Sequence, residues 1–312
     1  MDYLVADGAK VIGFDIIFSE KSVRGELDSK QINELKALSM NADVPEIREE
    51  LVMKLDAIRP ELNDAIFVSA VQNTGNVFLS SVFYADYKDI VQNPNIEADK
   101  DTVSKINTIL SKSSIPLPSH STHLKTFYNA TIPFFEVAGA SAGIGHINLF
   151  PDSDGVSRKF LPAVVFKDEI YLSFPLQIAA FAKDIPAKKI KVSKEGVVIG
   201  DTIMPLLPDG SAFIPYQGGR AVKNTHDSGA YEPFYRYISY HDVIASKDLR
   251  ESGEEPILHE KTFKDKIVLI TATAAGLSDL RATPFSPVSP GVEIHSNIID
   301  SILSKKFLKT IN

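Results

Sequence analysis

The chain has 312 residues, of which 44% are hydrophobic and 23% are charged, a composition typical of a folded globular protein and not of a disordered one. Its formal net charge of -7, with no lysine- or arginine-rich stretch to counter it locally, argues against nucleic acid as a partner. The absence of cysteine excludes a disulfide framework and a thiolate metal site.

The N-terminal residues MDYLVADGAK are typical of the last turns of a helix that Gly8 ends. No stretch has the roughly 18 consecutive apolar residues of a membrane-spanning helix, and no signal-peptide pattern is present. We therefore expect the chain to be a soluble fragment of a longer protein, with membrane-spanning segments on both sides of it.

The first third of the chain predicts a strand, a helical segment and a second strand. Residues 11–18 (VIGFDIIF) are almost all apolar or β-branched, which predicts a central strand with Asp15 near its carboxyl end. Residues 61–71 predict a helix and residues 76–83 another strand, which together give a right-handed βαβ unit. Residues 85–125 are polar and interrupted by prolines, so we interpret them as an insertion.

Residues 130–235 predict a smaller antiparallel β subdomain, because short β-like segments alternate there with glycines and prolines. Four turn-forming residues between HINLF and VSRKFLPAVVF predict a hairpin: Pro151, Asp152, Asp154 and Gly155. Ser173 and Pro175 predict the capped start of a helix that runs to Ala182.

The last part of the chain returns to a core pattern of strand, loop and amphipathic helix. Residues 267–270 predict a parallel strand buried on both faces, and residues 291–303 a helix with one apolar face. Before them, Ser239 and Asp242 have the spacing of a capping box. We predict an α/β fold: a mainly parallel sheet with helices on both faces, its core formed by residues 1–84 and 239–312, plus the antiparallel subdomain.

Four sequence blocks carry a resemblance to a known family. They are residues 11–20 (VIGFDIIFSE), 143–158 (GIGHINLFPDSDGVSR), 174–182 (FPLQIAAFA) and 266–303, and they resemble the type-2 CHASE family, the extracellular sensory domains of bacterial nucleotide cyclases, histidine kinases and related receptors. The resemblance implies that residues 1–312 form one extracytoplasmic sensory domain at the periplasmic face of the inner membrane. It also implies a homodimer that is tethered by flanking membrane helices.

The segment from Asp152 to Arg158 invites a comparison with calcium loops, because Asp-x-Asp-Gly opens many of them. The further oxygen ligands and the closing glutamate are missing, so a turn bonded to its own backbone is the alternative. His146, just before this turn, can be a ligand or a structural hydrogen-bonding group, and His295 in the last helix has the same two interpretations. No His-Glu-x-x-His spacing occurs, and we expect neither a metal nor a cofactor.

Asp15 invites a comparison with phosphatases whose nucleophilic aspartate ends a strand. That chemistry uses a second aspartate two residues later, where this chain has Ile17. No nucleophile elbow and no phosphate-binding loop is present. The loop residues 272–279 (ATAAGLSD) can bind a small anion through backbone N–H groups or simply pack closely on the sheet.

Asp279 and Arg281 lie in the loop between the last strand and the last helix. Such loops follow the carboxyl ends of parallel strands, where ligands usually bind in α/β sheets. A solvated loop pair and a ligand contact are the two interpretations. The candidate ligand-binding residues are Asp15, His146, Asp152, Asp154, Arg158, Asp279 and Arg281, and we name no catalytic residue.

The resemblance predicts a non-catalytic sensor that binds an unknown small ligand or periplasmic partner and controls a cytoplasmic cyclase or kinase. One alternative is a free-standing periplasmic binding or hydrolytic protein that uses Asp15, Asp152, Asp154 and Asp279 around a cleft. Another is a structural assembly domain. A sensor requires two states with different affinities for the ligand.

Overall fold

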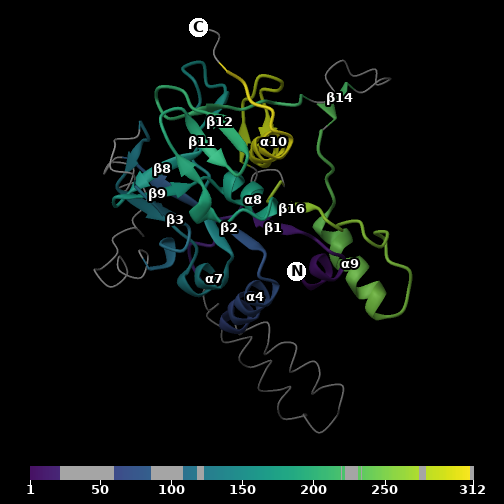
Figure 1. Cartoon of the computed structure of the whole chain (residues 1–312). Helices are drawn as coiled ribbons and strands as arrows, with labels where there is room; N and C mark the ends of the chain where they lie inside the picture. The colour runs from purple at the N-terminus through teal and green to yellow at the C-terminus, as the bar shows by residue number, and fades with distance from the viewer. Residues whose placement is uncertain are drawn as a thin grey trace, which may run out of the picture.

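A five-stranded sheet lies at the centre of the molecule (Figure 1). The computed structural model describes residues 1–21, 60–85, 108–117, 123–218, 220–221, 231–232, 234–273 and 279–309. The strands of this sheet are β1 (Val11–Phe14), β2 (Val77–Tyr84), β5 (Asn129–Thr131), β6 (Gly143–His146) and β16 (Ile267–Ile270). The predicted α/β class is confirmed.

The strands β16, β1, β2 and β6 are parallel neighbours, and β5 pairs antiparallel with the end of β2. The apolar runs in the sequence predicted the three strands β1, β2 and β16. The expectation that β16 is buried on both faces is wrong, because β16 lies at the edge of the sheet and its four residues are only half-buried.

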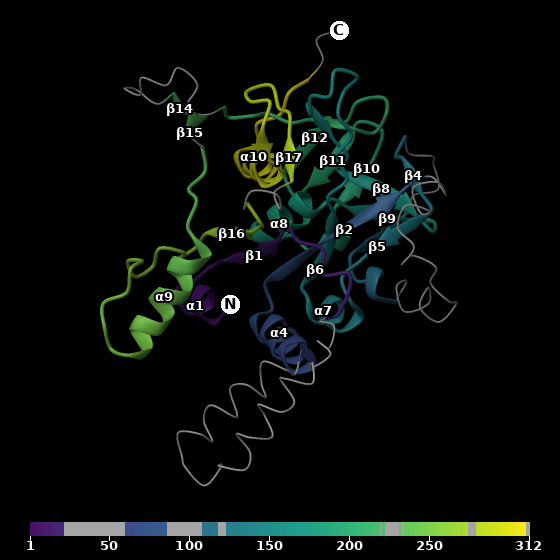
Figure 2. The same ribbon diagram turned by 180° about the vertical axis from the view of Figure 1, so that it is seen from behind.

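Helices cover both faces of this sheet, as Figures 1 and 2 show from opposite sides. Alternate residues of a strand point to opposite faces, and Val11 and Ile12 of β1 accordingly belong to different core clusters. Helices α8 (Phe174–Ala182) and α10 (Gly291–Ser304) pack on the face of Val11. The face of Ile12 packs against α1 (Asp2–Ala6), α4 (Pro60–Thr74) and α7 (Phe135–Ala140).

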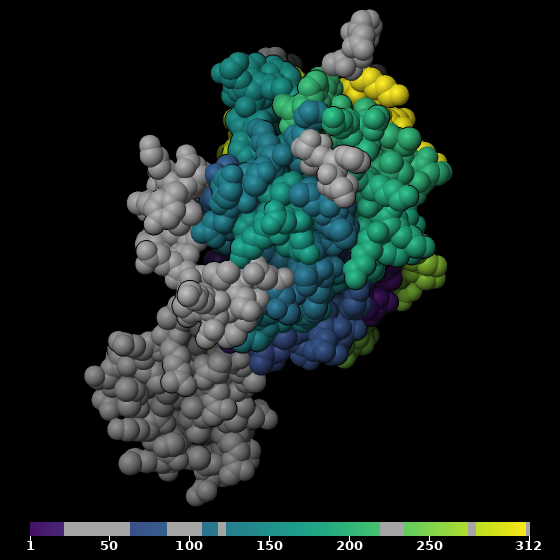
Figure 3. All heavy atoms as spheres, turned by 60° about the vertical axis from the view of Figure 1, so that its left-hand side comes forward, coloured from purple at the N-terminus to yellow at the C-terminus, as the bar shows by residue number. Residues whose placement is uncertain are grey.

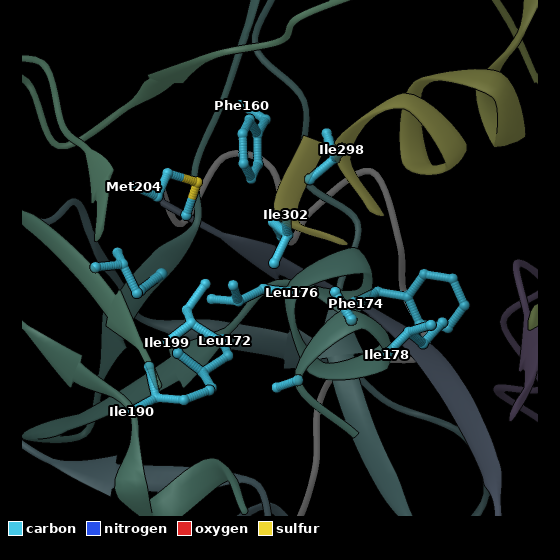
Figure 4. Close-up of a cluster of buried hydrophobic side chains, with 14 of the residues drawn as sticks. Phe160, Leu172, Phe174, Leu176, Ile178, Ile190, Ile199, Met204, Ile298 and Ile302 are labelled. Atoms are coloured by element: carbon cyan, nitrogen blue, oxygen red, sulfur yellow. The ribbon is translucent and has the colours of Figure 1, made fainter. Parts of the chain in front are cut away.

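Helix α8 is the centre of the larger core cluster (Figure 4). All its residues from Phe174 to Ala180 are buried, because the sheet lies on one side of the helix and α10 and the antiparallel strands lie on the others. Ile298 and Ile302 of α10 and Met204 of the antiparallel layer reach the same cluster. A nearly all-apolar helix is typical of such a buried position.

Antiparallel strands from the middle of the chain form the remaining layers. The larger sheet contains β3 (Ser114–Pro116), β9 (Glu169–Leu172), β8 (Ala163–Phe166) and β4 (Thr126–Phe127), in which only β4 and β8 are parallel. A second contains β10 (Lys191–Val192), β11 (Gly196–Ile199) and β12 (Thr202–Pro205). In Figure 3, these blue-green and green segments form most of the coloured surface.

Three further pairs are short: β7 (Lys159–Phe160) with β13 (Ala212–Phe213), β14 (Arg220–Ala221) with β15 (Tyr231–Glu232), and β17 (Leu280–Arg281) with β18 (Ser289–Pro290). The predicted hairpin around Gly155 is wrong in its pairing. The turn exists, with Asp152 N donating to Val156 O at 3.0 Å, but β6 pairs with β2, β7 with β13, and β8 with β9.

The division of the chain into a core, an insertion and a subdomain stays a prediction. Residues 86–107 of the predicted insertion lie outside the described residues, whereas β3 and β4 next to them pair with β9 and β8. Strand β6, from the predicted subdomain, joins the central sheet through β2.

Two predicted helix caps have the right position but lack the expected bond. Ser173 is the N-cap of α8, and Ser239 is the N-cap of α9 (Tyr240–Glu251), yet neither side chain makes a capping hydrogen bond. The Ser173 hydroxyl is buried and has no hydrogen-bond partner in the described part of the chain. An N-cap serine normally accepts a hydrogen bond from a free N–H of the first turn. Helix capping therefore does not explain why a serine is buried at position 173.

The N-terminal helix α1 is fixed to the segment before β16 by one buried carboxylate. Asp7 accepts hydrogen bonds from Lys261 N and Phe263 N, both at 2.8 Å. Gly8, with φ of +90°, then turns the chain into β1, as the sequence predicted.

Asp7→Asn is expected to lower the free energy of unfolding by about 1 to 2 kcal/mol, because either the buried N–H of Phe263 or the partly buried N–H of Lys261 then faces an amide donor instead of an acceptor. Urea unfolding measures the change. Asp2→Asn, at an exposed position of the same helix, is the matched control and should change the value by less than about 0.5 kcal/mol. Equal effects of the two substitutions would contradict the anchoring role of Asp7.

Candidate functional site

Polar side chains gather at the carboxyl ends of three neighbouring parallel strands. Asp15 directly follows β1, Ser80 and Ser81 lie within β2, and His146 is the last residue of β6. The register places them at neighbouring positions, since Ser80 is opposite Gly145 and Ser81 is opposite His146. The side chains of Ser81 and His146 point to one face of the sheet and that of Ser80 to the other. The carboxyl edge of a parallel sheet is the usual ligand-binding position in α/β proteins.

Two helices complete this cluster. Ser173, the N-cap of α8, forms an isolated parallel β-bridge with His146. His295, in the second turn of α10, lies edge-on to Phe174, with the ring centroids 5.7 Å apart. We call the set of Asp15, Ser80, Ser81, His146, Ser173 and His295 the polar cluster.

Asp15 and His295 form a buried pair within the polar cluster. Asp15 Oδ1 lies 3.6 Å from His295 Nε2, and the side chains are only 8% and 5% exposed. This distance is too long for a hydrogen bond, so the contact is electrostatic. Burial raises the pKa of Asp15, and the negative charge of Asp279 adds to the rise, whereas His295 and Arg281 oppose it. The charge on this carboxyl group therefore depends on its neighbours.

The polar cluster is short of hydrogen bonds. Within the described residues, six of its buried side-chain atoms have no hydrogen-bond partner: Ser80 Oγ, Ser81 Oγ, His146 Nδ1, His146 Nε2, Ser173 Oγ and His295 Nδ1. A buried polar atom without a partner costs about 1 to 3 kcal/mol, and native proteins have few of them. Several at neighbouring positions of the sheet, Ser80 on the face of α8 and α10 and Ser81 and His146 on the other face, indicate groups that are reserved for polar molecules.

His146 is neutral at physiological pH. Burial, with a smaller contribution from the charge of His295, lowers its pKa to about 3. A neutral imidazole offers one N–H donor and one acceptor nitrogen. The hydroxyl groups of the polar cluster can each donate and accept, and Ser80, on the same face of the sheet as Asp15 and His295, suits a small molecule with both kinds of group.

Asp279 and Arg281 lie at the exposed edge of the polar cluster. Arg281 Nε is 2.8 Å from Asp279 Oδ1, and the side chains are 43% and 55% exposed for Arg281 and Asp279, respectively. Asp279 O accepts a hydrogen bond from Gly291 N at 2.7 Å, which fixes the pair at the start of α10. Both charges act on Asp15. The adjoining residues 274–278 belong to the loop with the two interpretations of anion binding and close packing on the sheet, and they lie outside the described residues.

Asp152, Asp154 and Arg158 form a separate surface cluster. Arg158 Nη1 lies 3.0 Å from Asp152 Oδ2, Arg158 Nη2 lies 2.8 Å from Asp154 Oδ2, and Lys159 Nζ lies 2.9 Å from Asp152 Oδ1. The pKa of Asp152 is lowered by Lys159 and then Arg158, and the bond from Arg158 lowers that of Asp154 to about 2.

Cations of the chain itself therefore occupy the carboxylates that the calcium interpretation needs. In the described residues, no group of three or more His, Cys, Asp or Glu side chains could hold a metal ion. Val156 N donates to Asp154 Oδ1 at 3.1 Å, as expected for a turn bonded to its own backbone. The turn that carries these three residues pairs with the segment next to Arg281, since Ser157 N donates to Ala282 O at 2.8 Å.

Sequence reasoning missed the serines of the polar cluster. Ser80 and Ser81 lie in an otherwise apolar strand, and a pair of adjacent serines there was the available signal. The sequence pattern around Ser173 indicates a helix cap only, and that around His295 allows two roles. The structure adds Ser80, Ser81 and Ser173 to the site, and it pairs His295 with Asp15.

Comparison with known proteins agrees with the resemblance in the sequence. A family model described as the CHASE2 domain matches residues 1–312, which is the whole chain. No curated protein and no solved structure matches the chain. In the described part of the chain, no helix is both long and apolar enough to cross a bilayer. The chain therefore belongs to the CHASE2 domain family, whose members are sensory extracellular domains of signalling receptors.

Proposed function

We propose that this sensory domain detects a small polar molecule that binds at the polar cluster. The observation that carries the proposal is the set of buried hydroxyl and imidazole groups without partners at the carboxyl edge of the sheet. Natural proteins keep such destabilising groups where function requires them. A ligand that satisfies them would bind the folded domain selectively.

Binding at this position would act on two helices together. Ser173 begins α8 and His295 lies in α10, and the two helices pack against each other in the core. A ligand that binds one arrangement of these helices more tightly than another shifts the population between them. We propose that this shift is the signal, and that a cytoplasmic cyclase or kinase receives it across the bacterial inner membrane in a homodimeric receptor.

The geometry favours binding over hydrolysis. A serine hydrolase needs a serine hydroxyl bonded to a histidine that an acidic residue orients. Asp15 and His295 are near each other, but His295 Nδ1 bonds to no serine in the described residues. A sensory function does not require a chain of hydrogen bonds from serine to histidine to an acidic residue.

Ligand binding at the polar cluster should raise the thermal stability of the domain. We expect at least one compound in a panel of small polar metabolites and anions to stabilise the protein by about 2.7 kcal/mol at a hundredfold excess over its Kd. The shift should vanish in His295→Asn and weaken in Ser173→Ala. Ser173→Ala by itself should not destabilise the protein, because the hydroxyl makes no capping bond.

His259→Asn is the matched control, because His259 is exposed and outside the polar cluster. This variant should keep the full ligand-induced shift, measured by thermal unfolding with and without the compound. A shift that is the same in His295→Asn as in the unmodified protein would place the ligand elsewhere. A folded protein that no compound stabilises would argue for a sensor of protein partners.

A further inference from the structure

A pocket lies at the amino-terminal ends of β2 and β6, opposite the polar cluster. Its volume is about 280 Å³, near the lower limit of about 300 Å³ for small-molecule sites. Phe78 near the start of β2 and Ala142 just before β6 form one wall. The last turn of α8, with Phe181, and the segment after it, with Ile185, form the other. The pocket therefore lies away from the polar cluster, which is at the first turn of α8.

The walls of this pocket are mainly apolar and include two aromatic rings. Phe78 and Phe181 meet edge-on, with their ring centroids 5.1 Å apart and their planes at 67°. Gln177 also lines the pocket, but its Nε2 already donates to Ile144 O at 2.6 Å. The amide of Gln177 thus holds β6 and α8 together and is not the main polar contact for a ligand.

Two lysines supply the charge of the pocket. Lys112 and Lys188 both line it, and no carboxylate is among the described residues that do so. Lys112 Nζ donates to Gly139 O at 2.8 Å, which leaves other N–H donors of the ammonium group for a ligand. The charged residues among the described lining are thus both basic, although the chain has a net charge of -7.

We propose that this pocket binds a small monocarboxylate with a flat apolar body, of about the size of benzoate. The apolar walls and the two rings suit the body, and the ammonium groups of Lys112 and Lys188 suit the carboxylate through charge-assisted hydrogen bonds. This site is independent of the polar cluster. It assigns to the domain a second ligand class that differs from the small polar molecule proposed above.

Titration of the whole chain with benzoate, followed by ligand-observed NMR, tests the proposal. We expect saturable binding that is at least about tenfold tighter than that of benzamide, which has the same shape and no charge. The double variant Lys112→Gln/Lys188→Gln should weaken benzoate binding at least about tenfold for the same reason. Ala187→Phe, which fills the pocket from its half-buried rim and keeps both lysines, should abolish binding.

Lys189→Gln is the matched control, because Lys189 is next to Lys188 but does not line the pocket. It should bind benzoate like the unmodified chain, and so should His295→Asn, which separates this site from the polar cluster. Circular dichroism confirms that each variant is folded. The proposal is overturned if benzoate does not saturate, if benzamide or inorganic phosphate binds equally well, or if the folded lysine or Ala187→Phe variants bind benzoate unchanged.

Discussion

Gly145→Ala is expected to lower the free energy of unfolding by about 3 kcal/mol, because the first turn of α8 lies directly on this glycine. A Cβ atom at position 145 would be 2.3 Å from Phe174 Cα and 2.4 Å from Phe174 N. These are backbone atoms, so no side-chain rotation relieves the clash. The helix must move off the sheet, and the core cluster around α8 must loosen with it.

Guanidinium unfolding measures this effect through the midpoint and slope of the transition. Gly139→Ala is the control, because Gly139 lies in α7 and an added Cβ there would contact nothing within 4 Å. It should be neutral or stabilising by up to about 1 kcal/mol, since alanine favours a helix more than glycine does. A Gly145→Ala protein as stable as the Gly139→Ala protein would mean that α8 does not lie on β6.

Acid is expected to destabilise the domain through His146, by about 2 kcal/mol between pH 7.5 and pH 5. Burial lowers the pKa of His146 from 6.5 in the unfolded chain to about 3 in the folded one. Between these two pKa values the unfolded chain binds a proton that the folded chain does not. Stability is therefore lost as the pH falls, at about 1.4 kcal/mol per pH unit once the pH is below 6.5.

The comparison of the unmodified protein with His146→Gln at several pH values isolates this effect. Glutamine does not titrate, so the difference in the free energy of unfolding between the two proteins should change by about 2 kcal/mol over this pH range. His241→Gln is the control, because the His241 side chain is 84% exposed. If His146→Gln and the unmodified protein respond to acid in the same way, His146 is not held neutral by burial.

The buried carboxyl group of Asp15 acts in the opposite direction. Its pKa is raised by burial, so its contribution to stability is present at low pH and is lost as the pH rises through the folded pKa. Both proteins in the comparison above keep Asp15, and its contribution therefore cancels. Within the polar cluster, His146 therefore lowers the stability of the fold as the pH falls, and Asp15 lowers it as the pH rises.

Local patterns in the sequence predicted most of the central elements. The apolar runs of β1, β2 and β16 and the helical spacing in α10 are visible because burial on a sheet or a helix face repeats at short, fixed intervals. The predicted hairpin around Gly155 shows that local patterns predict a turn but not which strands pair. Its turn residues form the turn, but the partners of the flanking strands are distant in the sequence, and no local pattern specifies them.

Some residues of the candidate site could likewise be predicted from local sequence, whereas the role of others depends on distant parts of the chain. Asp15, Asp279 and Arg281 could be named from the sequence because they follow strands in a parallel sheet. Asp152 and Asp154 match a calcium-loop motif, but in the structure their carboxylates form ion pairs with Arg158 and Lys159. Motif spacing describes which ligands a loop offers, whereas the neighbours in space decide whether those ligands are free.

The sequence by itself determined the family, through the resemblance of four sequence blocks. It also determined the α/β class and the strand ends at which polar residues gather, because these depend on periodicity and order along the chain. Only the tertiary structure decided that Ser80, Ser81 and Ser173 are buried without hydrogen-bond partners beside the strand ends that carry Asp15 and His146. Serine is common in strands, turns and caps alike, so its residue type carries little information about its role. Its burial without a hydrogen-bond partner is a property of the packed protein, which brings together β2, β6, α8 and α10 from distant parts of the chain.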